Sequence, residues 1–344
     1  IFVGMISFRF FLFPFAFLYS IITSLRNLFF DVGLFSSKKY ENPTIGVGNL
    51  STGGTGKSVC VDYIISLIKD KKPVAVLSRG YGRLTKGFVE ASTESTFKEI
   101  GDEPMMLFTK HPELKVAVAE RRRLGMDNML KSATDDTVFV WDDCFQHRWV
   151  TPDLMILLTS YDHLFVNDFH LPVGNLRELS SGKKRGDVVI VTKCPTNITE
   201  QNKKEISSKL QLADTQHLFF AGIGYAKKIK NTERTFPINK IENLPFLLVT
   251  GIADPTPLLY YLKAIGGEFE HLQFPDHHLF TEKDIRQIKQ RSNGSLLLTT
   301  EKDFIRLNPV IDSNLLFYLE IEMKLNKEDE ERLNQIILTT SKIN

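Results

Sequence analysis

The sequence predicts an α/β fold with a mostly parallel sheet, flanking helices and a second, smaller α/β lobe. Three observations lead to this fold class. A glycine-rich turn joins an apolar run to a helical pattern within residues 45–68. Short apolar runs then alternate with amphipathic stretches along most of the chain. Residues 1–30 differ from the rest because they are almost continuously apolar, and they predict a separate membrane-associated helix.

The apolar segment at the start of the chain carries charge only at Arg9 and Arg26. Its uninterrupted stretch, 10–22, is shorter than the roughly 20 residues that a spanning helix needs. The segment also lacks a clear secretory signal pattern. We expect a helix that inserts part-way or spans with strain and leaves the next domain in the cytoplasm. A buried core helix is the alternative.

Composition sets the class of protein and the number of domains. A chain of 344 residues is long enough for two α/β domains, predicted at 31–214 and 215–344 after the helix at 1–30. The net charge of +2 and the lack of a long basic run give no reason to expect a nucleic-acid partner. Three cysteines without metal or redox spacing predict reduced thiols in a cytosolic setting.

The central motif is the stretch 45–58, IGVGNLSTGGTGKS. A strand, a glycine loop, Lys-Ser and a helix follow one another as in the phosphate-binding loop of nucleoside-triphosphate enzymes. Lys57 is expected to reach the β- and γ-phosphates and Ser58 to hold Mg²⁺, although Ser51 replaces the usual first glycine. A glycine turn that only joins a strand to a helix is the alternative. The residues predicted to contact the nucleotide are Ser51, Thr52, Gly53, Gly54, Thr55, Gly56, Lys57 and Ser58.

The rest of the chain alternates in the manner of a parallel sheet. Before the predicted domain boundary near Asp214, strands are expected at 73–77, 115–119, 138–141, 153–159 and 188–192, and a helix at 201–212. The second lobe repeats the rhythm without a second phosphate loop, which suggests a role in substrate or lid contacts. Its strands are expected at 245–250, 269–274 and 295–299, and its helices at 256–264, 281–292 and 326–337.

Acidic residues end the apolar strand at 138–141. Asp142 and Asp143 are expected to lie across from Ser58 and to complete the Mg²⁺ shell. Gln146 and His147 follow directly, so a titratable histidine stands beside the acids, although a lone histidine is more often structural.

Several other charged residues stand near predicted strand or helix ends. Arg79 and Arg83 lie on a glycine-rich loop after a strand, and Arg121 lies at a helix start. Each is a candidate phosphate ligand or part of a solvated surface. Asp102 and Glu103 open a helix, where acids are also ordinary caps. The long polar loop at 167–185, which contains Glu178, is of a length that is usually functional.

Taken together and in order, these motifs resemble a known family. The segments are VGNLSTGGTGKS, SRGYGR, GDEP, DD-x-x-QH, P-x-G-x-LRE, FPDHH and TEKD, after an apolar helix. The chain is similar along nearly its whole length to the tetraacyldisaccharide 4'-kinases, the lipid A 4'-kinases of Gram-negative bacteria. Cys144-Phe145 and Asn175 depart from the family pattern, and neither change removes a charged or phosphate-facing group.

The resemblance implies an enzyme that uses ATP and Mg²⁺. It would phosphorylate the 4'-hydroxyl of an acylated diglucosamine 1-phosphate in lipopolysaccharide biosynthesis, at the cytoplasmic face of the inner membrane. The resemblance makes Asp102 the catalytic base, assisted by His277, beside the catalytic Lys57; motif alone separates His277 from His278. Phosphate or substrate contacts are then assigned to Arg79, Arg83, Glu103, Arg121, Gln146, His147 and Glu178.

Two other classes of function remain open at this point. A membrane-tethered ATPase or GTPase switch would recruit a partner, but the stretch Thr192-Lys193-Cys194-Pro195 lacks the Asp of a guanine-specifying motif. A scaffold that only binds nucleotide would not need the acids at 102 and 142–143.

Overall fold

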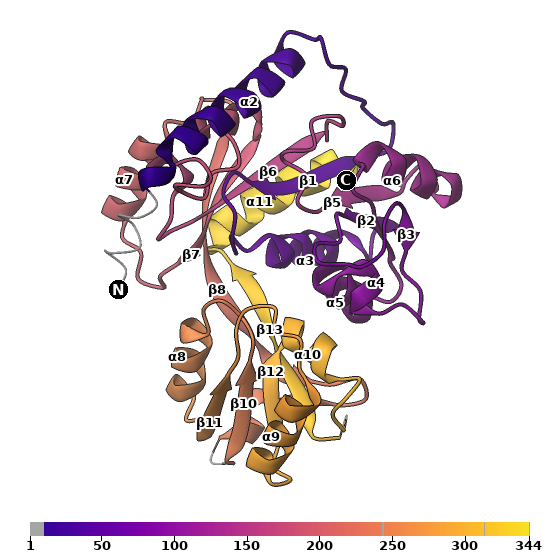
Figure 1. The fold of residues 1–344 in the computed structure, drawn as a ribbon, viewed down its shortest axis with the longest axis vertical. Helices are drawn as coiled ribbons and strands as arrows, with labels where there is room; N and C mark the ends of the chain where they lie inside the picture. The colour runs from indigo at the N-terminus through magenta and orange to yellow at the C-terminus, as the bar shows by residue number, and fades with distance from the viewer. Residues whose placement is uncertain (1–9, 243, 313, 344) are drawn as a thin grey trace.

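The computed structural model describes residues 10–242, 244–312 and 314–343 as one sheet with helices on its faces (Figure 1). The strand order is β11-β10-β12-β13-β8-β7-β6-β1-β5-β2-β4-β3, and β9 (Thr235–Pro237) pairs with β8. Neighbouring strands are parallel except in the β3–β4, β8–β13 and β8–β9 pairs. The predicted α/β class and the mostly parallel sheet are therefore confirmed.

The first lobe contains the strands around β1 (Thr44–Asn49), which is buried at every position. Burial on both faces explains why these strands are continuous apolar runs instead of alternating ones. The remaining strands are β2 (Val74–Ser78), β3 (Val89–Glu90), β4 (Lys115–Val118), β5 (Val138–Trp141), β6 (Leu154–Ser160), β7 (Val188–Cys194) and β8 (His217–Lys230).

Helices cover both faces of this sheet. The helix α3 (Lys57–Ile68) places Ile64, Ile65 and Ile68 in the core against β1 and β5. The other α-helices are α2 (Phe13–Asp31), α4 (Phe97–Ile100), α5 (Asp102–Lys110), α6 (Arg122–Met129) and α7 (Glu200–Leu210). The 3₁₀ turns are η1 (Phe10–Leu12), η2 (Leu130–Ser132), η3 (Phe165–Asn167) and η4 (Ser180–Arg185).

The second lobe continues the same sheet. Its strands are β10 (Phe246–Thr250), β11 (Phe269–Gln273), β12 (Leu297–Thr300) and β13 (Leu316–Lys324). Its helices are η5 (Ile238–Ile241), α8 (Thr256–Ala264), α9 (Glu282–Ser292) and α10 (Glu301–Leu307). The lobes are joined by a two-stranded ribbon, in which β8 and β13 run antiparallel and pair Tyr225 with Ile321. Figure 1 shows this ribbon between the upper and lower parts of the molecule.

The last helix, α11 (Lys327–Thr340), lies on the first lobe. Tyr63 of α3 donates a hydrogen bond from Oη to Asn334 Oδ1 at 2.6 Å, and Lys72 Nζ donates to the Ser341 carbonyl at 3.0 Å. Leu333 and Ile337 are buried in the first-lobe core. The final helix of the range 215–344, which was predicted as the second domain, thus packs on the first lobe, and the domain boundaries stay a prediction.

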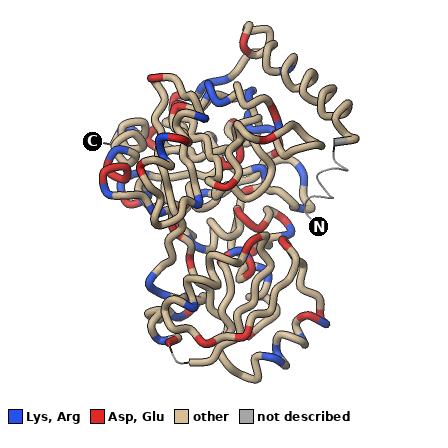
Figure 2. Tube along the Cα trace, turned by 90° about the vertical axis from the view of Figure 1, so that its left-hand side faces the viewer, with Lys and Arg blue, Asp and Glu red and all other residues tan. Residues whose placement is uncertain are grey.

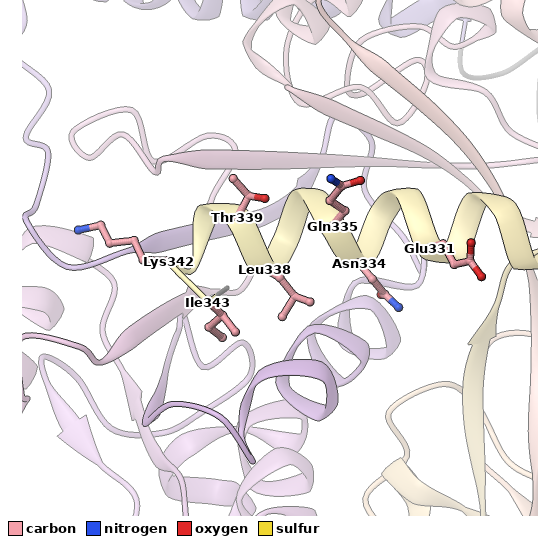
Figure 3. Close-up of a pocket in the computed structure, with 7 residues that line it drawn as sticks. All are labelled: Glu331, Asn334, Gln335, Leu338, Thr339, Lys342 and Ile343. Atoms are coloured by element: carbon pink, nitrogen blue, oxygen red, sulfur yellow. The ribbon is translucent and has the colours of Figure 1, made fainter.

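A groove runs beside α11 (Figure 3). Asn334, Leu338 and Ile343 contribute to its wall, together with other residues of the same helix and its C-terminal turn. None of the residues that line it belongs to the glycine loop or to the acids after β5.

The helix α2 is long and apolar enough to cross a membrane, judged by length and composition alone. Figure 2 shows it as an almost uncharged coil at the edge of the molecule. Only Ala16 and Phe30 are buried in it, and its large exposed side chains are Phe13, Phe15, Phe17, Leu18, Ile21, Ile22, Leu25, Leu28 and Phe29. The helix thus presents an apolar surface that the described part of the chain leaves uncovered. Residues 1–9 of the expected segment lie outside the described residues.

Candidate active site

The glycine loop leaves β1 and leads directly into α3. Gly53 and Gly56 have φ values of 100° and 86°, a left-handed conformation that favours glycine. Gly56 is the N-cap of α3, so the free N–H groups at the start of that helix face the loop. This arrangement is the anion-binding cradle that the sequence predicts. The loop is braced by a hydrogen bond from the Thr52 N–H to the Asn175 carbonyl at 2.8 Å.

Lys57 lies between two oxygen-bearing side chains at strand ends. Its Nζ is 3.4 Å from Asn49 Oδ1 and 3.6 Å from Asp143 Oδ1. Asn49, the last residue of β1, also donates to Thr55 Oγ1 at 2.8 Å. The lysine is thereby held over the loop, where its charge is available to phosphate oxygens.

Asp142 is the buried acid at the end of β5. Its Oδ2 accepts a hydrogen bond from Ser78 Oγ at 2.8 Å, whereas its buried Oδ1 has no hydrogen-bond partner. Burial, reinforced by the nearby Glu103 and Asp143 carboxylates, raises the pKa of Asp142 to about 6. An unpartnered buried carboxylate oxygen among like charges is a site that favours a cation.

Asp143 is in a different environment from its neighbour. It adopts φ 47° and forms two hydrogen bonds with the Arg177 guanidinium, at 2.9 and 3.1 Å. Burial raises the pKa of Asp143, but Arg177 and Lys57 outweigh that effect and hold it well below its usual range. Asp143 is thus paired with Lys57 and Arg177, whereas Asp142 has a carboxylate oxygen that is available to bind a metal cation.

The side chains at this place fit a Mg²⁺ ion that is shared with a nucleotide. Asp142 supplies the orphaned oxygen, and Ser58 is buried at the start of α3. Within the described ranges, no group of at least 3 His, Cys, Asp or Glu side chains is arranged to hold a metal by itself. Mg²⁺ in such enzymes takes one or two protein ligands and fills its shell with phosphate and water, so a complete protein cage is not needed.

Asp102 begins α5 and meets the second lobe. Its Oδ2 lies 3.2 Å from Nδ1 of His277, a residue in the turn after β11. The hydrogen bond to Asp102 raises the pKa of His277, even though partial burial opposes the shift. The Tyr81 ring also lies beside the imidazole, with ring centroids 6.2 Å apart. Asp102 and His277 thus form a carboxylate–histidine pair across the lobe boundary.

Glu103 is the next residue, and it is also engaged from the second lobe. Its carboxylate forms a short ion pair with the Lys302 ammonium from α10. Burial raises the pKa of Glu103, but Lys302, Lys57 and a hydrogen bond with Ser58 lower it overall. The Glu103–Ser58 contact places the Asp102–His277 pair next to the start of α3, where the phosphates are expected.

Comparison with known proteins identifies the family. A sequence model described as "Tetraacyldisaccharide-1-P 4'-kinase" matches residues 8–341. The chain belongs to the tetraacyldisaccharide-1-P 4'-kinase family.

Relatives and a solved structure agree with that family. A tetraacyldisaccharide 4'-kinase from Flavobacterium johnsoniae is 44% identical over 90% of this chain and 91% of its own. A tetraacyldisaccharide 4'-kinase from Bacteroides thetaiotaomicron is 40% identical over 95% of this chain and 92% of its own. The crystal structure of an LpxK from Aquifex aeolicus in complex with ATP is 31% identical and covers 97% of this chain and 99% of that one, with a TM-score of 0.78. The expected fold, family and ATP-dependent kinase class are confirmed, and the nucleotide-switch alternative is not favoured.

The three arginines that the sequence proposed as phosphate ligands differ in how exposed they are. Arg79 and Arg121 are exposed. Arg83 is nearly buried and pairs with Glu120 at 2.6 Å, so its guanidinium braces its own loop. A phosphate contact by Arg83, as the sequence suggested, would require that pair to break.

Residues 146, 147 and 178 lie close to α2, which contacts Gln146 through Arg26 and Glu178 through Asn27. Gln146 donates to the Asn49 carbonyl at 2.9 Å and to Glu178 Oε1 at 3.0 Å. Glu178 is 3% exposed, and its Oε2 accepts hydrogen bonds from Asn27 at 2.6 Å and Arg185 at 2.8 Å. Glu178 thus has contacts within the protein on both carboxylate oxygens, and its contact with the substrate stays a prediction. Burial lowers the pKa of His147 to about 3, so this imidazole is neutral at physiological pH.

Four residues contact the candidate site that the sequence did not single out: Asn49, Arg177, Lys302 and Arg306. Asn49, Arg177 and Lys302 stand inside motifs that carried the resemblance, VGNLSTGGTGKS, P-x-G-x-LRE and TEKD. Their position in those motifs was a usable signal, whereas Arg306 has no local pattern to mark it.

Proposed function

We propose that this protein transfers the γ-phosphoryl group of ATP to the 4'-hydroxyl of a tetraacyldisaccharide 1-phosphate, a lipid A precursor. The observation that carries the proposal is the Asp102–His277 pair, with 3.2 Å between Oδ2 and Nδ1, beside the phosphate loop. A nucleotide binder without transfer chemistry has no need of a carboxylate–histidine pair directed at its phosphate site.

The nucleotide half of the reaction falls to the first lobe. Backbone N–H groups of the loop 51–58 would surround the phosphates, and Lys57 would stabilise the charge that develops on the transferred group. Ser58 and Asp142 would hold Mg²⁺, which would neutralise phosphate charge during the transfer. Asp143 would keep Lys57 and Arg177 in place through the ion pairs at 3.6 and 2.9 Å.

The acceptor half falls to the lobe boundary. Asp102 would take the proton of the 4'-hydroxyl while the hydroxyl oxygen forms a bond to the γ-phosphorus of ATP. At the same time the bond between the γ-phosphorus and the bridging oxygen breaks, and that oxygen leaves with ADP. His277 would orient the carboxylate and share the proton through Nδ1. We infer that 31–214 together with α11 is the nucleotide-binding unit, and that the second lobe completes the base.

The helix α2 would bring the enzyme to its lipid substrate at the cytoplasmic face of the inner membrane. Its uncharged surface suits acyl chains, and its other side is hydrogen-bonded to the site loops. Tyr19 Oη donates to the Arg177 carbonyl at 3.0 Å and Arg26 donates to the Gln146 carbonyl at 2.6 Å. A sugar whose chains stay in the bilayer would therefore meet these loops first. Exposed Arg79 and Arg121 would be available to the 1-phosphate.

The test is transfer of radiolabelled γ-phosphate from ATP to a detergent-solubilised disaccharide 1-phosphate. We expect labelled lipid with the wild type and none with Lys57→Ala. The matched control is Lys71→Ala, an exposed lysine just beyond α3, which should leave transfer unchanged. ATP hydrolysis by the wild type without any labelled lipid would reject the proposal.

A further inference from the structure

Arg306 is a buried cation that faces the proposed base from the second lobe. It lies in α10 and is 4% exposed. Its Nη1 is 3.5 Å from Asp102 Oδ2, across the boundary between the lobes. Because the side chain is buried, it is not available to bind a nucleotide phosphate directly.

A second acid fixes the orientation of this guanidinium. Nη2 of Arg306 donates to Asp303 Oδ1 at 2.5 Å, one turn away on the same helix. The other oxygen of Asp303 accepts hydrogen bonds from the Gly251 N–H and from Thr300 Oγ1, both at 2.8 Å. Asp303 is thus saturated, and it anchors one edge of the guanidinium so that Nη1 is left directed at Asp102. Nη1 itself makes no hydrogen bond within the described residues.

The same side chain also reaches the backbone that presents His277. The Gly251 carbonyl accepts a hydrogen bond from Arg306 Nη2 at 3.3 Å and one from the His277 N–H at 3.1 Å. His277 has φ 56°, a left-handed conformation that is uncommon for residues other than glycine. A side chain at Gly251 would place its Cβ 2.9 Å from Asp303 Oδ1, so only glycine allows this approach.

We propose that Arg306 is a positioning residue for phosphoryl transfer, which assembles the Asp102–His277 pair by holding Asp102 with its side chain and the His277 turn through Gly251. The inference rests on the proposed role of Asp102 as base. Both His277 and Arg306 engage Oδ2 of Asp102, so Oδ1 is the oxygen left for the acceptor hydroxyl. A carboxylate held at one oxygen by a hydrogen-bonded imidazole and an ion-paired guanidinium of another lobe is correctly placed only when α10 meets α5.

The test compares Arg306→Gln and Arg306→Lys in the wild type and in His277→Ala, with turnover, KM for ATP and unfolding temperature measured for each. In the wild-type background Arg306→Gln should lower turnover about 10- to 100-fold, with KM for ATP within about twofold. Arg306→Lys keeps the charge and should recover part of the loss. In His277→Ala the same Gln substitution should cost clearly less than in the wild type, because the imidazole that Arg306 aligns with Asp102 is absent and only its hold on Asp102 remains to be lost.

Three results would overturn the inference. These are an equal loss in both backgrounds, a KM for ATP that rises as much as turnover falls, and a Lys variant as inactive as the Gln variant. The matched control is Arg291→Gln in α9, an exposed cation of the same lobe that pairs with Glu270 and should behave as wild type. If Arg306→Gln fails to fold, Arg306→Lys alone decides, with a turnover loss at unchanged KM as the required result. Asp102→Ala, run in parallel, tests the base separately: full activity there rejects the base and not merely its positioning.

Discussion

Nδ1 of His277 lies 3.2 Å from Oδ2 of Asp102, although 175 positions of sequence separate the two residues. One belongs to each lobe, so the pair exists only while the lobes are together. The hydrogen bond to Asp102 raises the pKa of His277, and a raised pKa makes the charged pair a favourable contact at low pH. Its contribution to lobe contact is complete below about pH 6.5 and is lost as the pH rises through the folded-state pKa.

Asp102→Ala should separate chemistry from binding. We expect turnover to fall about 10²- to 10⁴-fold, the usual range for a general base, while the Kd for ATP changes little. Turnover comes from the phosphate-transfer assay and the Kd from calorimetry with a non-hydrolysable ATP analogue. An equal loss of both would move Asp102 to the nucleotide or metal shell.

The two adjacent histidines should differ in their effect on turnover. His277 contacts Asp102, whereas His278 bonds to Asp284 at 2.9 Å within its own lobe. His277→Ala should therefore reduce turnover about 10-fold or more, and His278→Ala should reduce it far less. Because the folded pKa of His277 is raised, the wild-type rate should also change with pH above about 6.5, and this limb should vanish in His277→Ala. Similar losses and identical pH profiles for the two variants would contradict the assignment.

The two acids after β5 should affect stability with opposite signs in the absence of Mg²⁺. Burial raises the pKa of Asp142 from 3.8 to about 6, so its ionised form destabilises the folded state as the pH rises through that window. Arg177 and Lys57 overcome burial and lower the pKa of Asp143, so its ionised form stabilises above its unfolded pKa. At pH 8 Asp142→Asn should raise the free energy of unfolding by about 1–3 kcal/mol and Asp143→Asn should lower it by a similar amount.

Mg²⁺ gives the second measurement on this pair. Binding needs ionised Asp142, so the Mg²⁺ concentration for half-maximal activity should rise as the pH falls below about 6. Asp142→Asn should abolish most of the stabilisation that Mg²⁺ with ATP gives to the wild type in thermal unfolding. Wild-type Mg²⁺ dependence in that variant would place the metal elsewhere.

Glu178 should stabilise the packing of α2 on the first lobe. Its buried carboxylate joins Asn27 of that helix to Gln146 and Arg185 of the first lobe. Glu178→Gln removes the partner charge of Arg185 and should lower the free energy of unfolding by about 1–3 kcal/mol. Limited proteolysis should then cut faster within 32–43, the connection between α2 and β1. Glu200→Gln, which removes an exposed pair with Lys203, should change neither measurement.

The sequence was sufficient for the central strands of the first lobe, because these strands are buried on both faces and so read as apolar runs. It did not reveal β8 and β13. Gly222 and Gly224, together with the lysines near the end of β8, dilute the apolar pattern, and much of the ribbon between the lobes is only partly buried. The strand signal of β8 is therefore weak, whereas β13, with the sequence LFYLEIEMK, begins as an apolar run and then alternates, which was a usable strand signal.

The candidate site divides in the same way. The phosphate loop and the acids at 142–143 are placed by local order, since one strand end and one helix start bring them together. The roles of Lys302 and Arg306 depend on how one lobe meets the other, which no local spacing encodes. Arg83 and Glu178 have charges suited to a ligand, but burial beside Glu120 and Arg185 gives them partners within the protein.

The ribbon of β8 and β13 also determines how the second lobe is connected to the first. The chain leaves the first lobe along β8 and returns along β13, and Lys230 is the register partner of Tyr318. The segment 231–317, which lies between those two positions, is therefore a single insertion between two strands that already pair at the edge of the first lobe. Replacing it with a tight turn would leave a nucleotide binder that has lost His277, Lys302 and Arg306 in one deletion.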